Sequence, residues 1–447
     1  MRNPVSCFRT NILHKGQELW RENRAEFWFR ALFWTFWLSV VTFPIGYTAR
    51  DVFPLLCVVF LVGYYRHAWA RSVWRRLGVR PLFYCLWAMI LLGVVCSGDV
   101  WDSLKHAGTG LNKGFILPII AMECVRDARD LRRLVWACVA ACVWQGLDGV
   151  WQAWTGYDIM GYPLRFGRLT GTLGDYEVGN YIALAIIPAF GCRYLLRRRL
   201  GPAGSFFACA LLLTPAFFLL QGASARSGVL AVASAFVFWW LLTRGRRNFL
   251  ALSGAVFVML CFALLQASRM SPETVANDGR WSLWYLGWRV FCEHPFFGAG
   301  AGQYNAAFRA LGLVPAKDVI TISHPHNLYL DILYAHGLVG FALGMTFLAG
   351  FAWWGYRHIR QRLLMRHDGD ADRREYWILA GWFWVGYMGW LVNGIFGHDF
   401  YRIWWLAQAM CLLGIFIGAI VNGSGAVGEA PPEAAGEAPP EKADGAP

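Results

Sequence analysis

The sequence contains little charge for its length. Only 15% of its 447 residues are charged, whereas 57% are hydrophobic and 17% are aromatic. A water-soluble domain of this size needs more charged side chains than this to cover its surface. Long apolar windows recur along the whole chain, and such windows are typical of segments that cross a bilayer. These features argue against a soluble protein and predict an all-α, polytopic integral membrane protein.

The sequence also lacks the spacings that mark disulfide frameworks and metal sites. Its twelve cysteines fall mostly inside apolar windows, where we interpret them as small core residues. His324 and His326 form a His-x-His pair, but no well-placed pair of carboxylates completes a metal site around them. No metal and no cofactor is therefore predicted. No internal repeat is visible, which weakens the case for a transporter built from inverted repeats.

No cleavable signal peptide is expected at the start of the chain. About 26 polar and basic residues precede the first apolar window, and this window should therefore be retained as a membrane span. Twelve windows of roughly 15 to 25 residues are long enough to cross a bilayer. They lie near residues 27–47, 50–65, 81–98, 108–125, 134–154, 178–196, 205–222, 227–242, 249–266, 328–353, 375–396 and 403–421.

Lysine and arginine are distributed unequally between the segments that join these windows. The N-terminus, the tail and alternate loops hold 28 of the 41 Lys and Arg residues, which places both termini in the cytoplasm by the positive-inside rule. The basic excess is thus a signal of topology, and nucleic-acid binding is not expected. The chain divides into a cytoplasmic N-terminus (1–26), a transmembrane domain (27–421) with a long periplasmic loop (267–327), and a disordered Pro/Ala/Glu-rich cytoplasmic tail (422–447).

Twelve cations remain on or near the predicted outer face, where basic residues are usually scarce. They could extend to lipid headgroups or pair with nearby carboxylates, or they could form a shared site for a diphosphate, which guanidiniums bind bidentately. Arg226 and Arg280 are the strongest candidates for such a site, because both lie beside small residues that let a headgroup approach closely. The further candidates are Lys105, Lys113, Arg165, Arg168, Arg289 and Arg309.

Ionisable residues lie at the head of the tenth window, in the sequence ISHPHNLYLDILYAHGLVG. His326 directly precedes this window, and Asn327 is positioned to cap the helix. A neutral histidine beside arginines has a lowered pKa and can act as a base at pH 7, although a local hydrogen bond is the alternative role. Asp331 and His398 are possible partners, but nothing in the sequence supports either pairing.

Two further expectations concern helices near these histidines. His336 should lie about 15 Å further along the tenth span than His326, so the two cannot share a metal unless the helix breaks. The external loop carries aromatic residues at helical spacing, which predicts an amphipathic helix along the outer interface. These residues are Trp281, Trp284, Tyr285 and Trp288.

Four motifs in order resemble those of the bacterial O-antigen ligase and polymerase superfamily, over roughly residues 27–420. One departure is the turn at 175–180, DYEVGN, where many relatives carry Asn-Pro-Asn. The matching residues are Arg168 of an Arg-x-x-Gly-Thr entry, Arg226 and Leu230 of Arg-x3-Leu, Arg280 and the His-Pro-x-x-Gly-x-Gly run from His294 to Gly300, and His326, Asn327, Gly337 and Gly340 of His-Asn-x9-Gly-x2-Gly.

The resemblance implies a metal-independent, inverting glycosyl transfer at the periplasmic face of the inner membrane. The donor would be a polysaccharide on undecaprenyl diphosphate, and the acceptor a sugar hydroxyl of lipid A–core oligosaccharide. His326 would act as base, and Arg226 and Arg280 would stabilise the diphosphate. The expected substrate-binding residues are Arg168, Arg289, Lys105, Lys113, Arg165, Asn327 and His324.

Two other classes of function stay open. An O-antigen polymerase or a protein O-oligosaccharyltransferase of the same superfamily uses similar chemistry on another acceptor. A polyprenyl-lipid flippase or an anion transporter would also need arginines in or near the membrane. A transporter should, however, carry charges near mid-span in broken helices, whereas the cations here lie at the external ends of the predicted spans.

Overall fold

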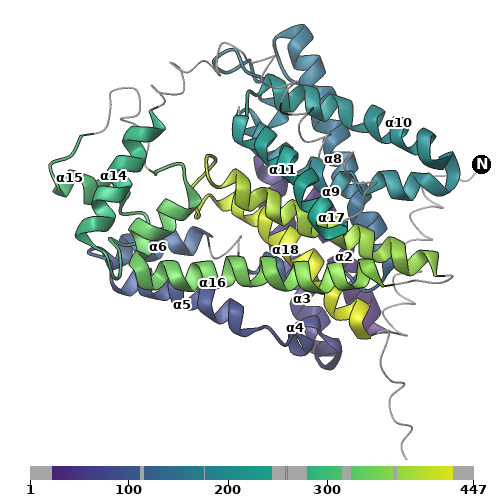
Figure 1. The fold of residues 1–447 in the computed structure, drawn as a ribbon, viewed down its shortest axis with the longest axis horizontal. Coiled ribbons are helices and arrows are strands. Elements are labelled where there is room, and N and C mark those ends of the chain that lie inside the picture. Colours follow the sequence, from purple (N-terminus) through teal and green to yellow (C-terminus); the bar gives the residue numbers. More distant parts are fainter. Residues whose placement is uncertain are drawn as a thin grey trace, which may run out of the picture.

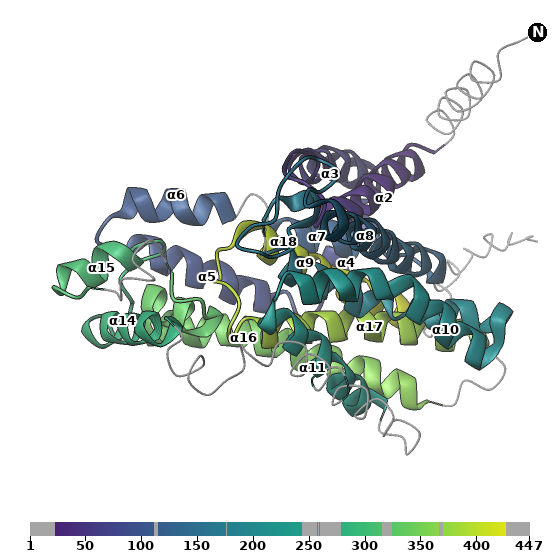
Figure 2. The same ribbon diagram turned by 90° about the horizontal axis from the view of Figure 1, so that it is seen from above.

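The computed structural model describes residues 23–110, 115–175, 177–243, 257, 259, 279–314, 324–365 and 370–425. This part of the chain is helical, without a named strand, which confirms the all-α class (Figures 1 and 2). Its helices are α2 (Arg24–Thr42), α3 (Tyr47–Ala68), η1 (Trp69–Arg71), α4 (Val73–Arg76), α5 (Pro81–Val95), α6 (Val100–Gly110), α7 (Leu117–Glu123), α8 (Ala128–Thr155), η3 (Gly171–Leu173), α9 (Val178–Ala189), α10 (Cys192–Gly222), α11 (Arg226–Thr243), α14 (Arg280–Glu293), α15 (Tyr304–Ala310), α16 (Leu328–Leu364), α17 (Ala371–Asn393) and α18 (Ile403–Gly425).

Several helices are long and apolar enough to cross a bilayer, so the chain is a multi-pass membrane protein. In the described residues there are six of them, and α5 and α9 are shorter apolar helices. The count of about twelve spans stays a prediction, because the ninth window, at 249–266, lies almost entirely outside the described residues. So do parts of the loop at 267–327 and nearly all of the tail. The six segments are Thr48–Arg76, Ala128–Thr155, Cys192–Gly222, Arg226–Thr243, Leu328–Leu364 and Ile403–Gly423.

Helices α9, α17 and α18 form the centre of the bundle. Every residue of α9 is buried, and Trp377 and Trp390 of α17 are fully enclosed. Helix α18 packs closely on α7 through glycines: a Cβ atom added at Gly414 or Gly418 would lie 2.4 or 2.3 Å from a carbonyl oxygen of α7. Small residues let helix backbones approach in this way inside membranes, where burial of apolar surface alone does not drive association.

Helix α16 is interrupted at Gly337, whose φ of +63° lies in the region that favours glycine. The segment 295–300 lies against this break and pairs with the backbone groups that the break releases, as polar backbone within a membrane requires. The tenth predicted window is therefore one helix interrupted near its start. Four hydrogen bonds join the segments: Ala299 N to Tyr334 O (2.8 Å), Gly300 N to Ala335 O (3.0 Å), Leu338 N to Pro295 O (2.8 Å) and Val339 N to Phe296 O (3.1 Å).

Helices α14 and α15 form a second, smaller core against the first part of α16. Leu283, Leu286 and Val290 are buried there, together with Tyr334 of α16. A helix is thus present in this region as α14, with apolar residues on its buried face and aromatic residues on its exposed face. Its placement along the membrane interface stays a prediction, although half-exposed aromatic side chains suit such a place. These are Trp281, Tyr285 and Trp288, with exposed fractions of 50%, 56% and 52%.

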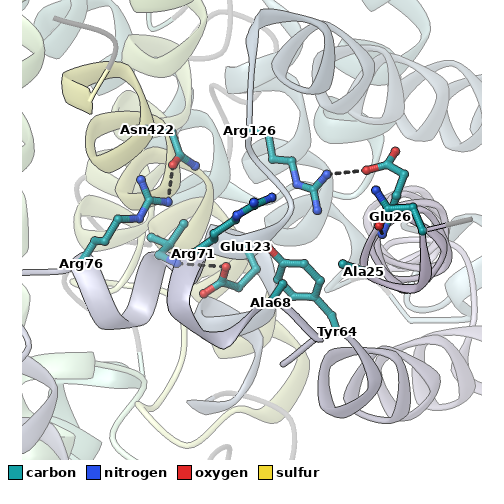
Figure 3. Close-up of a pocket in the computed structure, with 11 residues that line it drawn as sticks. Ala25, Glu26, Tyr64, Ala68, Arg71, Arg76, Glu123, Arg126 and Asn422 are labelled. Atoms are coloured by element: carbon teal, nitrogen blue, oxygen red, sulfur yellow. Dashed lines mark hydrogen bonds and ion pairs between the residues drawn. The ribbon is translucent and has the colours of Figure 1, made fainter. Parts of the chain in front are cut away.

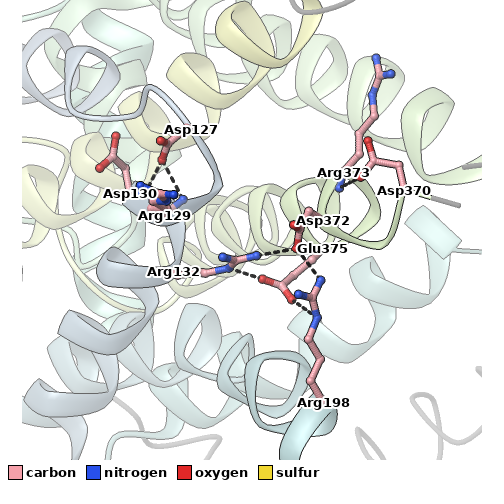
Figure 4. A network of polar contacts seen from close by, with 9 residues as sticks. All are labelled: Asp127, Arg129, Asp130, Arg132, Arg198, Asp370, Asp372, Arg373 and Glu375. Carbon is pink, nitrogen blue, oxygen red and sulfur yellow. Dashed lines mark hydrogen bonds and ion pairs between the residues drawn. The ribbon is translucent and has the colours of Figure 1, made fainter.

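The two ends of the bundle carry different polar groups, and α18 connects them. Arg402 directly precedes α18 and Asn422 lies near its end, and a helix of this length extends about 30 Å. We call the end that holds His324, His326 and His398 the histidine end. The opposite end holds the cavity drawn in Figure 3 and the ion-pair network drawn in Figure 4.

The ion-pair network joins the first two turns of α8, α10 and α17 (Figure 4). Arg132 and Arg198 each reach both Asp372 and Glu375. The residues of these pairs lie in or beside the basic segments 126–133, 193–199 and 357–374, which are among those that the positive-inside rule favours for the cytoplasm. The nitrogen–oxygen distances are 2.9 Å (Arg132–Asp372), 2.5 Å (Arg132–Glu375), 2.6 Å (Arg198–Asp372) and 3.4 Å (Arg198–Glu375).

Candidate functional site

His326 lies at the histidine end, directly before α16, with an unusual backbone φ of +53°. The expected cap is present, because Asn327 Oδ1 accepts hydrogen bonds of 3.0 Å from the N–H groups of Tyr329 and Leu330. The Nδ1 atom of His326 lies 2.9 Å from the carbonyl oxygen of Gly397. A carbonyl oxygen can only accept, so we assign the ring proton to Nδ1. The Nε2 atom then keeps its lone pair.

The surroundings of His326 keep its ring neutral. Burial above all, together with the charges of His324 and Arg280, lowers its pKa to about 4. The hydrogen bond to Gly397 and the charge of Asp399 act in the opposite direction. At pH 7 the ring is therefore uncharged. A neutral imidazole with an unprotonated Nε2 can accept a proton from a hydroxyl group.

The loop 394–402, between α17 and α18, completes the histidine end. His324 Nε2 lies 3.8 Å from Asp399 Oδ1. The ring centroids of His326 and His398 are 6.5 Å apart, and those of His324 and His326 are 4.2 Å apart. Sequence reasoning missed Asp399 and named His398 without support. The only signal was the polar run GHDFYR between two predicted spans.

Asp331, the other possible partner of His326, has a different contact. Its Oδ2 atom accepts a hydrogen bond of 2.9 Å from the backbone N–H of Phe400. The buried Asp331 carboxyl group therefore holds the loop 394–402 against α16. Its role is to fix the position of the loop that carries Asp399.

Asp399 places a negative charge beside His324 and His398. Burial opposes its ionisation, but the charges of His324, Arg402 and His398 hold its pKa below the usual value. His106 of α6 acts in the same direction, so α6 also contributes to this cluster. An ionised carboxylate surrounded by cationic or protonatable groups leaves the cluster able to accept a further anion.

A buried chain of hydrogen bonds connects His398 to the start of α11, where Arg226 lies. The Nε2 atom of His398 lies 3.2 Å from Asn180 Nδ2, from which it accepts. In turn, Asn180 Oδ1 accepts from Ser227 Oγ at 2.9 Å and from Asn393 Nδ2 at 3.1 Å. Ser227 directly follows Arg226, so these hydrogen bonds fix the position of the start of α11 relative to the loop 394–402.

The turn at 175–180 contributes two residues to the histidine end. Glu177 Oε2 accepts from Arg402 Nη2 at 2.5 Å, and Asn180 belongs to the chain described above. This is the turn in which the sequence departs from many relatives of the superfamily that it resembles. The Arg402–Glu177 pair and the Asn180 amide show what these residues do here: they anchor the loop 394–402 to α9.

The three arginines expected to bind diphosphate lie at or near element starts. Arg226 is the first residue of α11, and Arg280 is the first residue of α14. Arg280 is close enough to His326 to lower its pKa. The N–H of Leu169, which follows Arg168, donates to Gly222 O at 3.1 Å, so this turn lies beside the chain that enters α11.

Helix α14 is held at the histidine end by an aromatic contact. Trp284, one turn after Arg280, stacks on Phe396 of the loop 394–402, with ring centroids 5.7 Å apart and planes inclined by 27°. This contact aligns the start of α14 with the loop that accepts the hydrogen bond from His326. The structure therefore brings Arg280, His324 and His326 to one place.

The other expected cations have looser positions. Arg165 forms an exposed pair of 3.4 Å with Asp175. Lys105 and Arg289 are exposed. Lys113 lies outside the described residues. Within the described part of the chain, no contact joins Lys105 or Arg289 to the histidines.

Across the described ranges, no group of three or more His, Cys, Asp or Glu side chains could hold a metal ion. The histidine end combines the neutral imidazole of His326, with its lone pair on Nε2, the ionised carboxylate of Asp399 and the guanidiniums of Arg280 and Arg402. Such a set can bind an anionic group and remove a proton from a neighbouring hydroxyl.

Comparison with known proteins finds a match to a family model over part of the chain. The model of the O-antigen ligase family matches residues 207–345, which is consistent with a member of the O-antigen ligase superfamily. The matched range contains Arg226, Arg280, His324, His326 and Asn327. No curated protein matches the chain. The family is one of glycosyltransferase-like ligases and polymerases, so lipid-linked sugars are the class of substrate that it suggests.

Proposed function

We propose that this protein is an O-antigen ligase. It transfers a polysaccharide from undecaprenyl diphosphate to a sugar hydroxyl of lipid A–core oligosaccharide. The histidine end faces the periplasm, and the opposite end faces the cytoplasm, as the distribution of lysine and arginine favours. The family match over residues 207–345 supports the superfamily; the choice of ligation rests on the His-Asn-x9-Gly-x2-Gly pattern at His326.

One observation carries the mechanism: His326 is neutral, with its proton on Nδ1 and its lone pair on Nε2, and Arg280 acts on it. The acceptor oxygen attacks the anomeric carbon from the side opposite the diphosphate. Its proton passes to Nε2 of His326, and the bond from the anomeric carbon to the diphosphate oxygen breaks. The electron pair remains on the diphosphate, and the configuration at the anomeric carbon is inverted.

The arginines stabilise the charge that develops on the leaving diphosphate. Arg226 and Arg280 contact its oxygens, with Arg168 in support, because guanidiniums bind phosphate oxygens bidentately. Cationic side chains fixed at the leaving group lower the barrier without a metal ion. The secondary cations Lys105, Lys113, Arg165 and Arg289 then contribute to attraction of the donor.

The bound diphosphate also tunes the base. Its negative charge neutralises the field of Arg280, which lowers the pKa of His326 in the absence of substrate. The pKa of His326 therefore rises when the donor binds, toward the value near neutral pH at which a general base is most effective. The base is strengthened only in the complex that can react.

Two neighbouring residues position the acceptor. Asn327 uses its Oδ1 atom to cap α16, which leaves its Nδ2 atom as a donor for a sugar hydroxyl. His324 lies against Asp399, and its imidazole is a second polar group beside His326. The centroids of the two histidine rings are 4.2 Å apart. Together they orient the hydroxyl that His326 deprotonates.

The test is transfer with purified components. Wild type, His326→Ala, Arg226→Ala and Arg280→Ala are incubated with undecaprenyl-diphosphate glycan and lipid A–core in the presence of a chelator. We expect wild type to form capped lipopolysaccharide and each variant to lose at least about 10²-fold in rate, the usual contribution of a general base or an anion-stabilising donor. Arg75→Ala, which removes an exposed arginine on α4 at the opposite end, is the control and should retain activity.

The products separate the alternatives. Lengthening of the lipid-linked glycan without capping of lipid A–core would identify a polymerase. Transfer to protein would identify an O-oligosaccharyltransferase. Absence of all transfer by folded wild type, with movement of the lipid-linked glycan across vesicle membranes, would replace the proposal with a flippase.

A further inference from the structure

The cavity at the end opposite the histidines has a volume of about 280 Å³ (Figure 3). This volume is just below the range of roughly 300–1,000 Å³ that is typical of ligand pockets. Its charged lining consists of two carboxylates, Glu26 and Glu123, and three guanidiniums, those of Arg71, Arg76 and Arg126. The balance between these groups decides which ligand the cavity can accept.

Glu123 accepts hydrogen bonds that stabilise the wall of the cavity. Its side chain is buried, and it accepts from the N–H groups of Val73 and Trp74 at 3.0 and 3.1 Å and from the hydroxyl of Tyr65 at 2.9 Å. These bonds fix the short helix α4 against the end of α7. Its oxygens are thus hydrogen-bonded to three donors that are not arginines, and Arg76 acts on it only electrostatically.

Glu26 is shared between two arginines. It accepts from Arg30 at 2.8 Å and from Arg126 at 2.7 Å, and Arg30 does not line the cavity. The guanidinium of Arg126 is also held over the ring of Phe29, with its central carbon 3.1 Å from the centroid. Arg126 is therefore fixed in place while its charge is only partly balanced.

Arg71 and Arg76 supply two further cations. Arg76 acts electrostatically on Glu123, but neither arginine forms a close ion pair with a carboxylate in the described part of the chain. Arg76 donates to the neutral amide of Asn422 at 2.5 Å and to the carbonyl of Ser72 at 3.3 Å. Figure 3 shows the Arg71 side chain extending between Glu123 and Arg126. Two guanidiniums directed into one cavity repel each other unless an anion lies between them.

We propose that this cavity binds one phosphate group, held by Arg71, Arg76 and Arg126. Guanidiniums recognise phosphate through paired N–H donors, and the cavity offers three of them with one shared carboxylate. The phosphate comes from the headgroup of an anionic membrane lipid or from free phosphate. The site is separate from the transfer chemistry, because α18 places it about 30 Å from Arg402 at the other end of the bundle.

Binding to the full-length, detergent-solubilised protein tests this proposal. The probes are short-chain phosphatidylglycerol, glycerol 1-phosphate and inorganic phosphate, and the readout is the ligand-dependent rise in melting temperature. We expect Arg71→Gln to weaken binding at least tenfold and the Arg71→Gln, Arg76→Gln double variant to abolish it. Arg75→Gln is the matched control, because Arg75 is exposed on the same short helix but does not line the cavity.

Each outcome has one meaning. Saturable stabilisation by the lipid that glycerol 1-phosphate and inorganic phosphate do not match identifies a lipid headgroup, and equal stabilisation by inorganic phosphate identifies free phosphate. Equal binding by wild type and Arg71→Gln, or an equal loss in Arg75→Gln, overturns the proposal. Binding that persists in His326→Ala shows that the two ends act independently, whatever becomes of the transfer assay.

Discussion

At the scale of single residues, His326 is subject to opposing effects from three elements. Burial and the cation at the head of α14 favour its neutral ring, while the loop 394–402 opposes them through the Gly397 carbonyl and the Asp399 charge. A histidine controlled in this way has a protonation state that depends on its neighbours. Its acid limit in catalysis is therefore a direct report on the geometry of the site.

The pH dependence of kcat/KM should reflect this lowered pKa. His326 must be neutral to accept a proton, and with a pKa of about 4 it stays so down to nearly that pH. At pH 5 the protein should retain about 90% of its limiting kcat/KM, whereas a histidine with an ordinary pKa of about 6.5 would leave about 3%. Transfer rates measured at low donor concentration between pH 4 and pH 8 decide between these values.

Two variants should move this acid limit in opposite directions. The Asp399 charge raises the pKa of His326, so Asp399→Asn should move the limit to lower pH; Arg280 lowers it, so Arg280→Gln should move the limit to higher pH. The position of the limit can be read even where the maximal rate falls. A limit that stays in place in both variants, or that survives in the residual activity of His326→Ala, would assign it to another group.

At the scale of elements, the break in α16 joins the site to the rest of the fold. His336, beside the break, has its Nε2 atom 2.9 Å from the hydroxyl of Tyr401, which belongs to the loop 394–402. The segment 295–300 fills the break from the other side. The break is thus a junction between α16, the chain that follows α14, and the loop that supports His326.

Gly337→Ala should destabilise this junction. A Cβ atom at Gly337 would lie 2.3 Å from the carbonyl carbon of Phe296, and the φ of +63° costs a residue with a side chain about 1–3 kcal/mol. We expect a lower melting temperature and slower transfer. Gly108→Ala is the matched control: nothing lies within 4 Å of its added Cβ atom, and alanine should be neutral or slightly stabilising in helix α6. Equal melting temperatures for the two variants would refute a structural role for the break.

Helix positions are largely readable from the sequence, whereas their interruptions are not. The windows at 375–396 and 403–421 correspond to α17 and α18, because a span needs about 20 apolar residues. The described part of the window at 108–125 is instead divided between the end of α6 and the seven-residue α7. Hydropathy averages over a window and so does not register such divisions, or the break at Gly337.

Residues of the candidate site could be predicted from the sequence where their role depends on their position at a helix start. His326 and Asn327 follow from a helix start at the membrane edge. The partners do not, since 218 residues separate Asn180 from His398 and 225 separate Glu177 from Arg402. Only packing of α9 against the loop 394–402 makes them neighbours, and no local pattern encodes it.

At the scale of the whole molecule, the two ends differ in how their charges are balanced. The opposite end joins its helices by arginine–carboxylate pairs, as in the network of Figure 4. The histidine end has the Arg402–Glu177 pair and holds Arg280 close to the neutral His326. In the proposed transfer, the groups of the histidine end bind the lipid-linked substrate. The proposed reaction therefore requires that this end of the bundle faces the periplasm.

Native cysteines can establish this orientation. Cys96, which follows α5, and Cys292, on α14, are exposed, whereas the other described cysteines are buried or half-buried. If the histidine end faces the periplasm, a membrane-impermeant maleimide should label wild type in spheroplasts, and Cys96→Ser, Cys292→Ser should lose most of this label. A cysteine introduced by Arg75→Cys, at the opposite end, should react only after the membrane is permeabilised. The reverse pattern would place the histidines in the cytoplasm, where neither the acceptor nor the completed polysaccharide is expected, and would exclude periplasmic ligation.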